Sequence, residues 1–397
     1  MAELKAAYLA DYVRVPFSRS RPNQPEKDVY NSIRMDQALS LLIKNLLART
    51  KFKPEEVGDV ITGSAFQTGE NWLYGGRHPV LLAGLPVYVP GQGIDRACAS
   101  SMNAAADGAM EIMTGNSDVV IAGGIEHLTH VPMANNPALA PNTRLLTRPE
   151  YMAYHMSTGY SMGLTAEKLA EEMACPREEM DRYSYESHMK ASRSVDQGWF
   201  KGELLEMKVE FEGGTKVIDV DQSIRRDTTM DQLAKLQPSF KAGGLITPGN
   251  SSPLNAGASA VVLASKAKLD EHGLKPLARI ASMGWAGVDP GVMGKGPVPA
   301  SRKALERAGL GVDDVDLWEI NEAFAVVPLY AIKELSLDPS RVNVHGGAIS
   351  IGHPLGASGA RLLGTLAREL QSTGKEYGMA TLCVGGGQGF SILLQRA

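Results

Sequence analysis

The sequence predicts an α/β protein whose helices and sheets are stacked in layers. Apolar residues recur at helical spacing over residues 35–47, and the apolar stretch 57–63 has the length and composition of a buried strand. A succession of helix, strand and glycine turn then occurs near residue 100 and again near the C-terminus. Alternating helical and strand periodicity along a chain is typical of layered α/β domains.

The first helix–strand–turn succession begins at residue 98. Four apolar residues fall on one face of its helix: Met102, Ala105, Ala109 and Met113. Gly115 ends this helix, and the stretch 118–124, DVVIAGG, is predicted as a strand that closes in glycines. Residue 98 therefore lies where a helix begins.

The second succession covers residues 357–387. Leucines at 362, 363, 366 and 370 indicate a helix, and GMATLCVGGG at 378–387 indicates a strand followed by a glycine turn. The same order of elements near both ends suggests two related halves, although their sequence identity is poor.

The region between the two successions has a different composition. Proline and asparagine gather at 132–142, helices rich in Met and Glu are expected over 162–192, and GNSSPLNAG at 249–257 is predicted as a loop. The apolar strand at 259–265 returns the chain to the first sheet. We expect a first half at 1–127 completed by 251–275, an inserted lid or substrate domain at 128–250, and a second half at 276–397.

Composition limits the classes of function. With 397 residues, 44% of them hydrophobic, the chain can bury more than one core. Its 40 Lys and Arg residues stand against 44 Asp and Glu, and no dense basic block is present, so nucleic acid is not an expected partner. The N-terminal residues lack the pattern of a secretory or transit signal, and no apolar run approaches the roughly 18 residues of a membrane span. We expect a cytoplasmic location.

The three cysteines, Cys98, Cys175 and Cys383, are too sparse for a disulfide framework. They also lack the CxxC spacing of a zinc site, so no protein-bound metal is expected. A reducing compartment would keep all three as thiols. Free cysteines are often simply buried apolar residues, and for any one of them alone this is the more frequent case.

Cys98, in DRACASSM, is a candidate nucleophile because the positive end of a helix dipole at its N-terminus favours a thiolate. His353 stands in the glycine-rich stretch NVHGGAISIGHPLGASGAR at 343–361, where the backbone can approach a ligand closely. It is a candidate base, although it could also only cap the helix that follows. His345 has no motif of its own and is the weaker candidate.

Two more polar groups stand at strand ends. Cys383 is followed by VGGGQG, whose amides could face a developing negative charge. Asn321, in NEAFA, follows an apolar strand and could orient a water molecule. Taken alone, Cys383 could be a buried strand residue and NEAFA a helix start.

Together these motifs resemble the thiolase family over essentially the whole chain. The likeness rests on CASS at 98–101, GGIEH at 123–127, MGLTAE at 162–167, GNSSPLNAG, DPGVMG at 289–294, NEAFA, GGAISIGHPLGASGAR and CVGGGQG. The resemblance implies a five-layered αβαβα core of two duplicated halves, with an inserted loop domain that binds coenzyme A.

The resemblance also implies a role for each catalytic residue. Cys98 would accept the acyl group, His353 would activate it, and Cys383 would serve as acid and base at the leaving or attacking carbon. Asn321 would hold a water that forms, with His353, an oxyanion hole for the thioester enolate. The N–H groups of Cys98 and Gly385 would form a second hole. Coenzyme A is expected as a substrate, with no permanently bound cofactor and no metal.

For coenzyme A the likeness suggests contacts with seven residues: Arg225, Phe240, Ser252, Met162, Met293, Ala323 and Phe324. Arg225 is expected near the nucleotide, Phe240 beside the adenine or pantetheine, and Ser252, Ala323 and Phe324 along the pantetheine arm. One departure is Ser161-Met-Gly, where many short-chain biosynthetic thiolases have His-Met-Gly.

EHLTHVPM at 126–133 resembles the bacterial fatty-acid-oxidation thiolases, so a 3-ketoacyl-CoA thiolase of β-oxidation is the preferred reading. A biosynthetic acetoacetyl-CoA thiolase is the alternative, and a non-catalytic acyl-CoA-binding relative is an alternative of another class. The resemblance implies a homodimer or homotetramer, or a complex with an enoyl-CoA hydratase/3-hydroxyacyl-CoA dehydrogenase partner.

Overall fold

The computed structural model describes residues 4–397 and repeats one succession of elements twice. The first half contains β1 (Ala7–Arg14), α1 (Met35–Thr50), β3 (Asp59–Gly63), α3 (Ser100–Thr114), β5 (Val119–His127) and β8 (Asn255–Ser265). The second contains β9 (Ala278–Gly287), α10 (Pro297–Ala308), β10 (Leu317–Ile320), α12 (Ser358–Thr373), β11 (Tyr377–Val384) and β12 (Gln388–Arg396). In both halves the first strand lies beside the last, followed by the third and the second. The predicted duplication is therefore confirmed at the level of topology.

Strand directions repeat as well. Among the strands named above, β3 pairs with β5 in parallel and β10 with β11 in parallel, whereas their other pairings within each half are antiparallel. The short edge strand β4 (Gln92–Ile94) also pairs with β3 in parallel. The two sheets meet where β1 pairs briefly with β9. Short elements complete the core: β2 (Ser18–Arg19), α2 (Arg77–Leu82), β4 (Gln92–Ile94), α9 (Lys266–Glu271) and α11 (Val326–Leu335).

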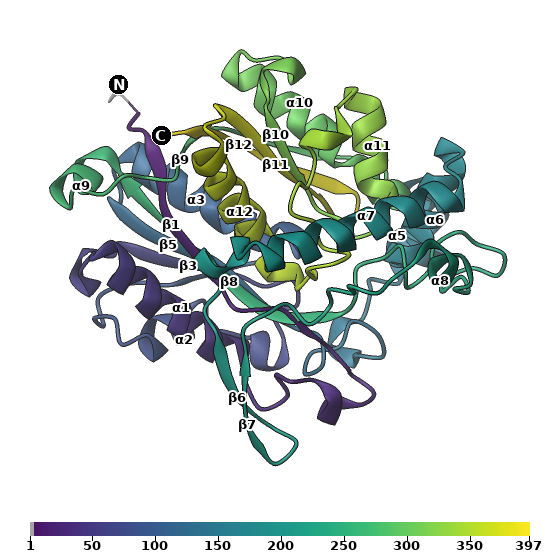
Figure 1. Ribbon diagram of the computed structural model, residues 1–397, viewed down its shortest axis with the longest axis horizontal. Helices are drawn as coiled ribbons and strands as arrows, with labels where there is room; N and C mark the ends of the chain where they lie inside the picture. The colour runs from purple at the N-terminus through teal and green to yellow at the C-terminus, as the bar shows by residue number, and fades with distance from the viewer. Residues whose placement is uncertain (1–3) are drawn as a thin grey trace.

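The helices form three layers around these two sheets (Figure 1). Apolar residues of α1 pack against the outer face of the first sheet, and those of α10 and α11 against the outer face of the second. α3 and α12 are buried between the sheets. The predicted five-layered αβαβα core is thus confirmed, and its central layer carries the helix that follows Cys98.

Small residues make the central layer possible. α3 is rich in alanine, and a Cβ added to Gly359 at the start of α12 would lie 2.3 Å from the Met102 nitrogen. Likewise, a Cβ on Gly63 at the end of β3 would lie 2.4 Å from the Ser100 carbonyl carbon. The first approach brings the N-termini of α3 and α12 together, and the second places the start of α3 against the end of β3.

Between β5 and β8 the chain leaves the core and forms α4 (Arg144–Thr147), α5 (Met156–Gly159), α6 (Met162–Met173), α7 (Arg177–Asp196), β6 (Met207–Phe211), β7 (Gly214–Ile218) and α8 (Met230–Ala234). β6 and β7 pair as a separate hairpin, drawn below the core in Figure 1. The loop predicted at 249–257 is shorter than expected. β8 already begins at Asn255 because its first residues pair with the end of β5, His127 opposite Ala256.

Within residues 4–397, no helix has both the length and the apolar character required to cross a membrane.

Candidate active site

Cys98 lies in a 3₁₀ turn, η4 (Ala97–Ala99), directly before α3. Ala97 adopts a left-handed conformation with φ 44°, which is unusual for a residue with a Cβ. Its N–H donates to Asp95 Oδ1 at 2.7 Å, and the Arg96 N–H donates to Ser100 Oγ at 2.9 Å. Polar groups on both sides of the turn therefore hold the cysteine in place.

The Cys98 sulfur is crowded by protein atoms although the residue keeps some exposed surface. Burial raises the pKa of the thiol to about 12, and the backbone N–H of Gly385 beside the sulfur only partly offsets this effect. The helix N-terminus favours a thiolate, but burial acts in the opposite direction and is the larger effect on the pKa of Cys98. A base must remove the proton when Cys98 reacts.

Cys383 approaches the same place from the second half. It is fully buried near the end of β11, which contacts η4, and burial together with the neighbouring Cys98 raises the pKa of its thiol well above the usual range. The turn that follows uses Gly386 and Gly387 with φ near +80°. A Cβ on Gly387 would lie 2.4 Å from the Val288 carbonyl oxygen, so this turn requires glycine. Two thiols almost 300 residues apart in sequence thus share one site.

His353 completes the group. It precedes η11 (Leu355–Ala357), which contacts η4, and Cys98 packs against the apolar cluster that contains Leu355. The hydroxyl of Ser358 donates to the Pro354 carbonyl at 2.9 Å, so it accepts from His353 Nδ1 at 2.6 Å. Nε2 then keeps its lone pair. Burial and the charge of Arg361 lower the pKa of His353 to about 3, so the ring is a neutral base.

Asn321 directly follows β10, at the strand end where it was predicted. Its Nδ2 lies 3.3 Å from His353 Nε2, and its Oδ1 is buried without a hydrogen-bond partner in the described part of the chain. A buried amide oxygen in this situation is a suitable acceptor for a water molecule.

The sequence reasoning missed the residues that position these groups. Asn255 Oδ1 accepts from the His353 N–H at 2.8 Å, and Glu126 accepts from the N–H groups of Ala65 at 2.8 Å and Gly356 at 3.0 Å. Burial raises the pKa of Glu126 to about 7, and the amides that it accepts from hold it down in part. Asn255 lies in GNSSPLNAG and Glu126 in GGIEH, so a polar residue of unassigned role inside a motif was the available signal.

Glu322, the second residue of NEAFA, organises the loop that carries His353. Its carboxylate accepts from Tyr183 Oη, Ser187 Oγ, Asn343 Nδ2 and the Ile349 N–H, at 2.8–3.1 Å. A Cβ on Gly347 would lie 2.3 Å from the Glu322 carboxylate carbon, so the loop wraps tightly around this group. His345 packs on the Trp199 ring at 3.9 Å, as expected of a structural histidine.

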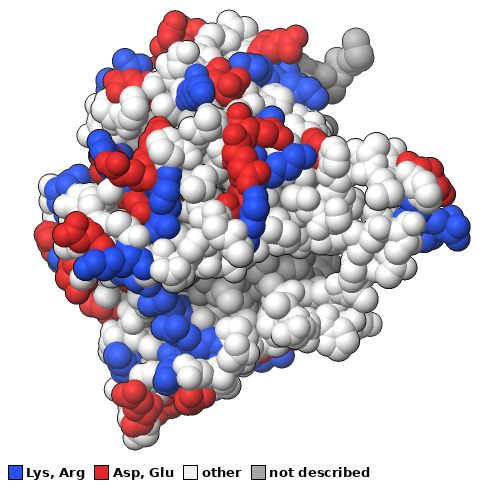
Figure 2. Space-filling view, turned by 90° about the vertical axis from the view of Figure 1, so that its right-hand side faces the viewer, with Lys and Arg blue, Asp and Glu red and all other residues white. Residues whose placement is uncertain are grey.

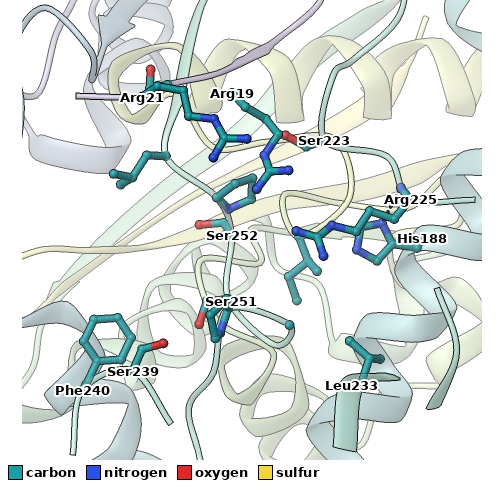
Figure 3. A pocket seen from close by; sticks show the side chains of 16 residues that line it. Arg19, Arg21, His188, Ser223, Arg225, Leu233, Ser239, Phe240, Ser251 and Ser252 are labelled. Atoms are coloured by element: carbon teal, nitrogen blue, oxygen red, sulfur yellow. Dashed lines mark hydrogen bonds between the residues drawn. The ribbon is translucent and has the colours of Figure 1, made fainter. Parts of the chain in front are cut away.

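A cavity of about 410 Å³ opens beside this core. Three of the residues expected to contact coenzyme A line this cavity, namely Arg225, Phe240 and Ser252 (Figure 3). Ile349 also lines it and belongs to the apolar cluster that contains Cys383. The face that carries α6, α7 and α8 is hollowed, with Lys and Arg side chains along one border (Figure 2).

The other four expected contact residues lie behind the cavity wall. Phe324 meets the Phe240 ring edge-on with 6.1 Å between centroids, and the Ala323 carbonyl accepts from the Ser252 N–H at 2.9 Å. Met162 and Met293 pack in the apolar cluster of Cys383, where Met293 is almost fully buried. These four therefore support the cavity or the thiols and do not line the cavity itself.

Positive charge gathers at one end of the cavity, where the guanidinium groups of Arg19, Arg21 and Arg225 converge (Figure 3). Burial and the charges of the other two arginines lower the pKa of Arg19, and burial together with Arg225 and Arg19 lowers the pKa of His188 to about 4. Across residues 4–397, no carboxylate lies within ion-pair distance of these three arginines. The cavity end is suited to an anion with several negative charges.

The protonation states lead to a pH prediction. Between the pKa values of His353 and Cys98 the resting pair is a neutral imidazole and a neutral thiol. The thiolate fraction, and with it the rate of alkylation by iodoacetamide, should rise about tenfold per pH unit from pH ~6 to ~9. The rate of inactivation by iodoacetamide, measured at several pH values across this range, tests this expectation. A plateau around neutral pH would instead indicate a preformed thiolate–imidazolium pair.

Comparisons with known proteins agree with this geometry. The family model "Thiolase, N-terminal domain" matches residues 14–267, and "Thiolase, C-terminal domain" matches residues 274–396. The chain is 42% identical over 390 residues to a 3-ketoacyl-CoA thiolase of Psychrobacter cryohalolentis, covering 97% of this chain and 98% of that protein. It is 41% identical to one of Saccharophagus degradans, with 98% and 97% coverage.

Solved structures give the same result. Human mitochondrial 3-ketoacyl-CoA thiolase superposes with a TM-score of 0.87 at 34% identity, and Bacillus anthracis acetyl-CoA acetyltransferase with 0.88 at 35%, each covering all of both chains. Since both domain models and full-length relatives match, this chain belongs to the thiolase family.

Proposed function

We propose that this chain is a 3-ketoacyl-CoA thiolase, which uses coenzyme A to cleave 3-ketoacyl-CoA into acetyl-CoA and a shortened acyl-CoA. The observation that carries the proposal is the convergence of Cys98, Cys383 and the neutral His353 around one site, with the Gly385 N–H beside the Cys98 sulfur. The relatives at 41–42% identity with this name support the choice of substrate class.

In the first half-reaction His353 Nε2 takes the proton of Cys98, and the sulfur attacks the 3-keto carbon. The N–H groups of Cys98 and Gly385 stabilise the resulting alkoxide. When this intermediate collapses, the bond between C2 and C3 breaks and the electron pair moves into an acetyl-CoA enolate. A free carbanion is too basic to leave, so enolate stabilisation by the Asn321 water and His353 is essential. One well-placed donor contributes about 3 kcal/mol to such a transition state.

Cys383 then donates its proton to C2, and acetyl-CoA leaves. In the second half-reaction coenzyme A gives its thiol proton to the Cys383 thiolate and attacks the acyl-Cys98 thioester. The bond between the acyl carbon and the Cys98 sulfur breaks, and the protonated His353 returns its proton to that sulfur as the shortened acyl-CoA forms. A thioester replaces a thioester in this step, so the transfer is close to reversible. The raised pKa of both thiols suits these roles, because each must exist as a proton donor during the cycle.

The alternative is a biosynthetic acetoacetyl-CoA thiolase, and the likeness to the Bacillus anthracis acetyl-CoA acetyltransferase keeps it open. Steady-state rates on acetoacetyl-CoA and on 3-ketoacyl-CoA substrates of eight or more carbons distinguish the two. We expect higher kcat/KM on the longer substrates. A strong preference for the four-carbon substrate would replace the first proposal with the second, and inactivity on both would favour a non-catalytic acyl-CoA-binding protein.

We propose that Arg19, Arg21 and Arg225 together bind the phosphates of coenzyme A. Arg19 and Arg21 are thus added to Arg225, which the family resemblance had already suggested. Each lost charged hydrogen bond to a phosphate costs about 1.5–3 kcal/mol, so Arg19→Gln or Arg21→Gln should raise the KM for coenzyme A about tenfold or more. The kcat should change little, because these contacts are equal in ground and transition states.

The matched control is Arg226→Gln, next to Arg225 in sequence, whose exposed side chain pairs with Asp196. It should leave KM unchanged. Adenosine 3′,5′-bisphosphate, tested as a competitive inhibitor, provides a direct readout because it contains only the phosphate end of the substrate. Equal inhibition of wild type and Arg19→Gln would contradict the assignment.

A homodimer is also proposed. α2 and the chain on both sides of it, up to the edge strand β4, expose several large apolar side chains, namely Trp72, Tyr74, Leu81, Leu82, Val87 and Tyr88. β4 ends the sheet, so a second copy could cover this patch and the open strand edge together. Light scattering should report a dimer, or a tetramer made of two dimers, for the wild type. The Val87→Asp variant should be a monomer. Copurification tests the expected hydratase/dehydrogenase partner.

A further inference from the structure

Arg96 lies in the turn that carries Cys98 and has no part in the acyl transfer proposed above. It belongs to the motif DRACASSM, in which Cys98 is the candidate nucleophile. Its backbone N–H donates to Ser100 Oγ at 2.9 Å, whereas its side chain forms no hydrogen bond and no ion pair within residues 4–397. A guanidinium group has five N–H donors and usually finds such partners. The side chain of Arg96 is therefore held by another kind of contact.

That contact is with two aromatic rings of the second half. The Arg96 guanidinium carbon lies 5.1 Å from the centroid of the Phe390 ring and 5.7 Å from that of Trp285. The two residues are directly opposite one another on β12 and β9, and their rings stack with 5.5 Å between centroids. A guanidinium within about 6 Å of an aromatic centroid forms a cation–π contact. Arg96 thus joins the Cys98 turn to the second sheet.

Phe390 gives this contact a fixed base. Its side chain is almost fully buried and belongs to the apolar cluster against which Ala97 and Cys98 also pack. Trp285 is 39% exposed, so one end of the aromatic pair reaches solvent. The guanidinium therefore rests on one buried and one partly exposed ring. Partial loss of its hydration strengthens the attraction to the rings.

The turn needs support because its backbone is strained. Ala97 has φ 44°, a left-handed conformation that a residue with a Cβ adopts only at a cost. Such residues persist where the surrounding structure holds them. The two hydrogen bonds that define the turn, from the Ala97 N–H to Asp95 and from the Arg96 N–H to Ser100, begin and end within the turn itself. They fix its shape but not its place relative to the second half.

We propose that Arg96 is a positioning residue whose guanidinium holds the strained Cys98 turn against Trp285 and Phe390. This role rests on the proposed thiolase function, in which Cys98 is the nucleophile. Arg96 acts through the backbone of the turn and not through contact with the substrate. Its contribution is to the placement of the sulfur.

Placement matters because the partners of Cys98 come from the second half. They are the Gly385 N–H beside its sulfur, the Cys383 thiol and the neutral His353. A turn released from that half moves its sulfur relative to all three. A displacement of about 1 Å can cost on the order of 100-fold in rate, so a small part of that shift is measurable.

Arg307 offers a matched control. Its guanidinium carbon lies 5.3 Å from the centroid of the same Trp285 ring, and its Nη1 donates to the Met283 carbonyl at 2.6 Å. Arg307 belongs to α10 in the second half and not to the Cys98 turn. Arg307→Gln therefore removes an arginine from the same aromatic pair without releasing the turn.

The first measurement is thiolysis by the full-length Arg96→Gln and Arg307→Gln variants. Two cation–π contacts of a partly exposed guanidinium together change an equilibrium by about fivefold to tenfold, so Arg96→Gln should lower kcat by that factor. The KM for coenzyme A should change by less than about twofold, because the arginines at the phosphate end of the cavity are untouched. Arg307→Gln should keep the wild-type kcat. An equal loss in both variants would contradict a special role of Arg96.

A second substitution separates support of the turn from other effects of Arg96. Glycine adopts a φ of this sign without strain, so Ala97→Gly removes the cost that the arginine offsets. In the Ala97→Gly background, Arg96→Gln should therefore lower kcat by no more than about twofold. A general structural or electrostatic role of Arg96 predicts the same loss in both backgrounds, and that result would overturn the proposal.

Alkylation by iodoacetamide reports the placement of Cys98 without any thiolase substrate. Burial raises the pKa of this thiol to about 12. A released turn exposes the sulfur to water, so at pH ~8 the peptide that contains Cys98 should be alkylated about threefold faster in Arg96→Gln than in wild type or Arg307→Gln. A similar Tm of the two variants verifies that the whole fold is intact. Equal alkylation rates would refute the role of Arg96, whereas inactivity of wild type on 3-ketoacyl-CoA substrates would refute only the proposed function.

Discussion

Cys98→Ala should abolish thiolysis, lowering kcat by on the order of 10⁴-fold or more, as removal of an attacking nucleophile does in other covalent mechanisms. Without the thiol no acyl-enzyme can form, and the Gly385 N–H beside the Cys98 sulfur has no alkoxide to stabilise. Thiolysis of a 3-ketoacyl-CoA, followed by absorbance, measures the loss.

Mass spectrometry separates loss of chemistry from loss of folding. Wild type incubated with an acyl-CoA should gain the mass of one acyl group on the peptide that contains Cys98, and Cys98→Ala should gain none. Cys175→Ala is the control, because Cys175 is a buried thiol whose sulfur contacts Pro176 and Glu179. It should keep both activity and acylation. Full activity in Cys98→Ala would show that another group carries the acyl chain.

Arg14→Ala should lower the free energy of unfolding by about 3–5 kcal/mol, because it leaves two buried carboxylates without their partner. Arg14 is fully buried at the end of β1. Its Nε donates to Glu203 Oε1 at 2.7 Å, and its Nη1 and Nη2 donate to the two Asp221 oxygens at 2.6 and 2.9 Å. These contacts tie the segment between β5 and β8 to the first sheet.

The matched control for Arg14→Ala is Arg182→Ala. Arg182 and Glu178 form an ion pair of the same 2.7 Å length on the exposed face of α7. Solvent screens that pair, so its loss should cost no more than about 1 kcal/mol. Thermal and denaturant unfolding of the two variants compare them directly. A similar loss in both would mean that the buried network adds nothing beyond a surface pair.

The sequence by itself determined the identity and order of the main elements. Helical periodicity located α1, α3 and α12, and short apolar runs located β3, β8 and β11, because burial of one face imposes a period on the chain. Motif likeness to thiolases predicted the five-layered core and named the catalytic candidates. The edges were less accurate, as at Asn255, because strand pairing with a distant partner extends β8 beyond its apolar run.

Only the tertiary structure decided the electrostatics of the site. Position at a helix N-terminus favours a thiolate at Cys98, whereas burial by other elements raises the pKa of this thiol to about 12. The same holds for Arg19 and Arg21, which carry no local motif and meet Arg225 only after the chain has folded. Arg96 likewise meets Trp285 and Phe390 only when the two halves pack together. Desolvation and charge proximity depend on atoms that are distant in sequence, so no local pattern can reveal them.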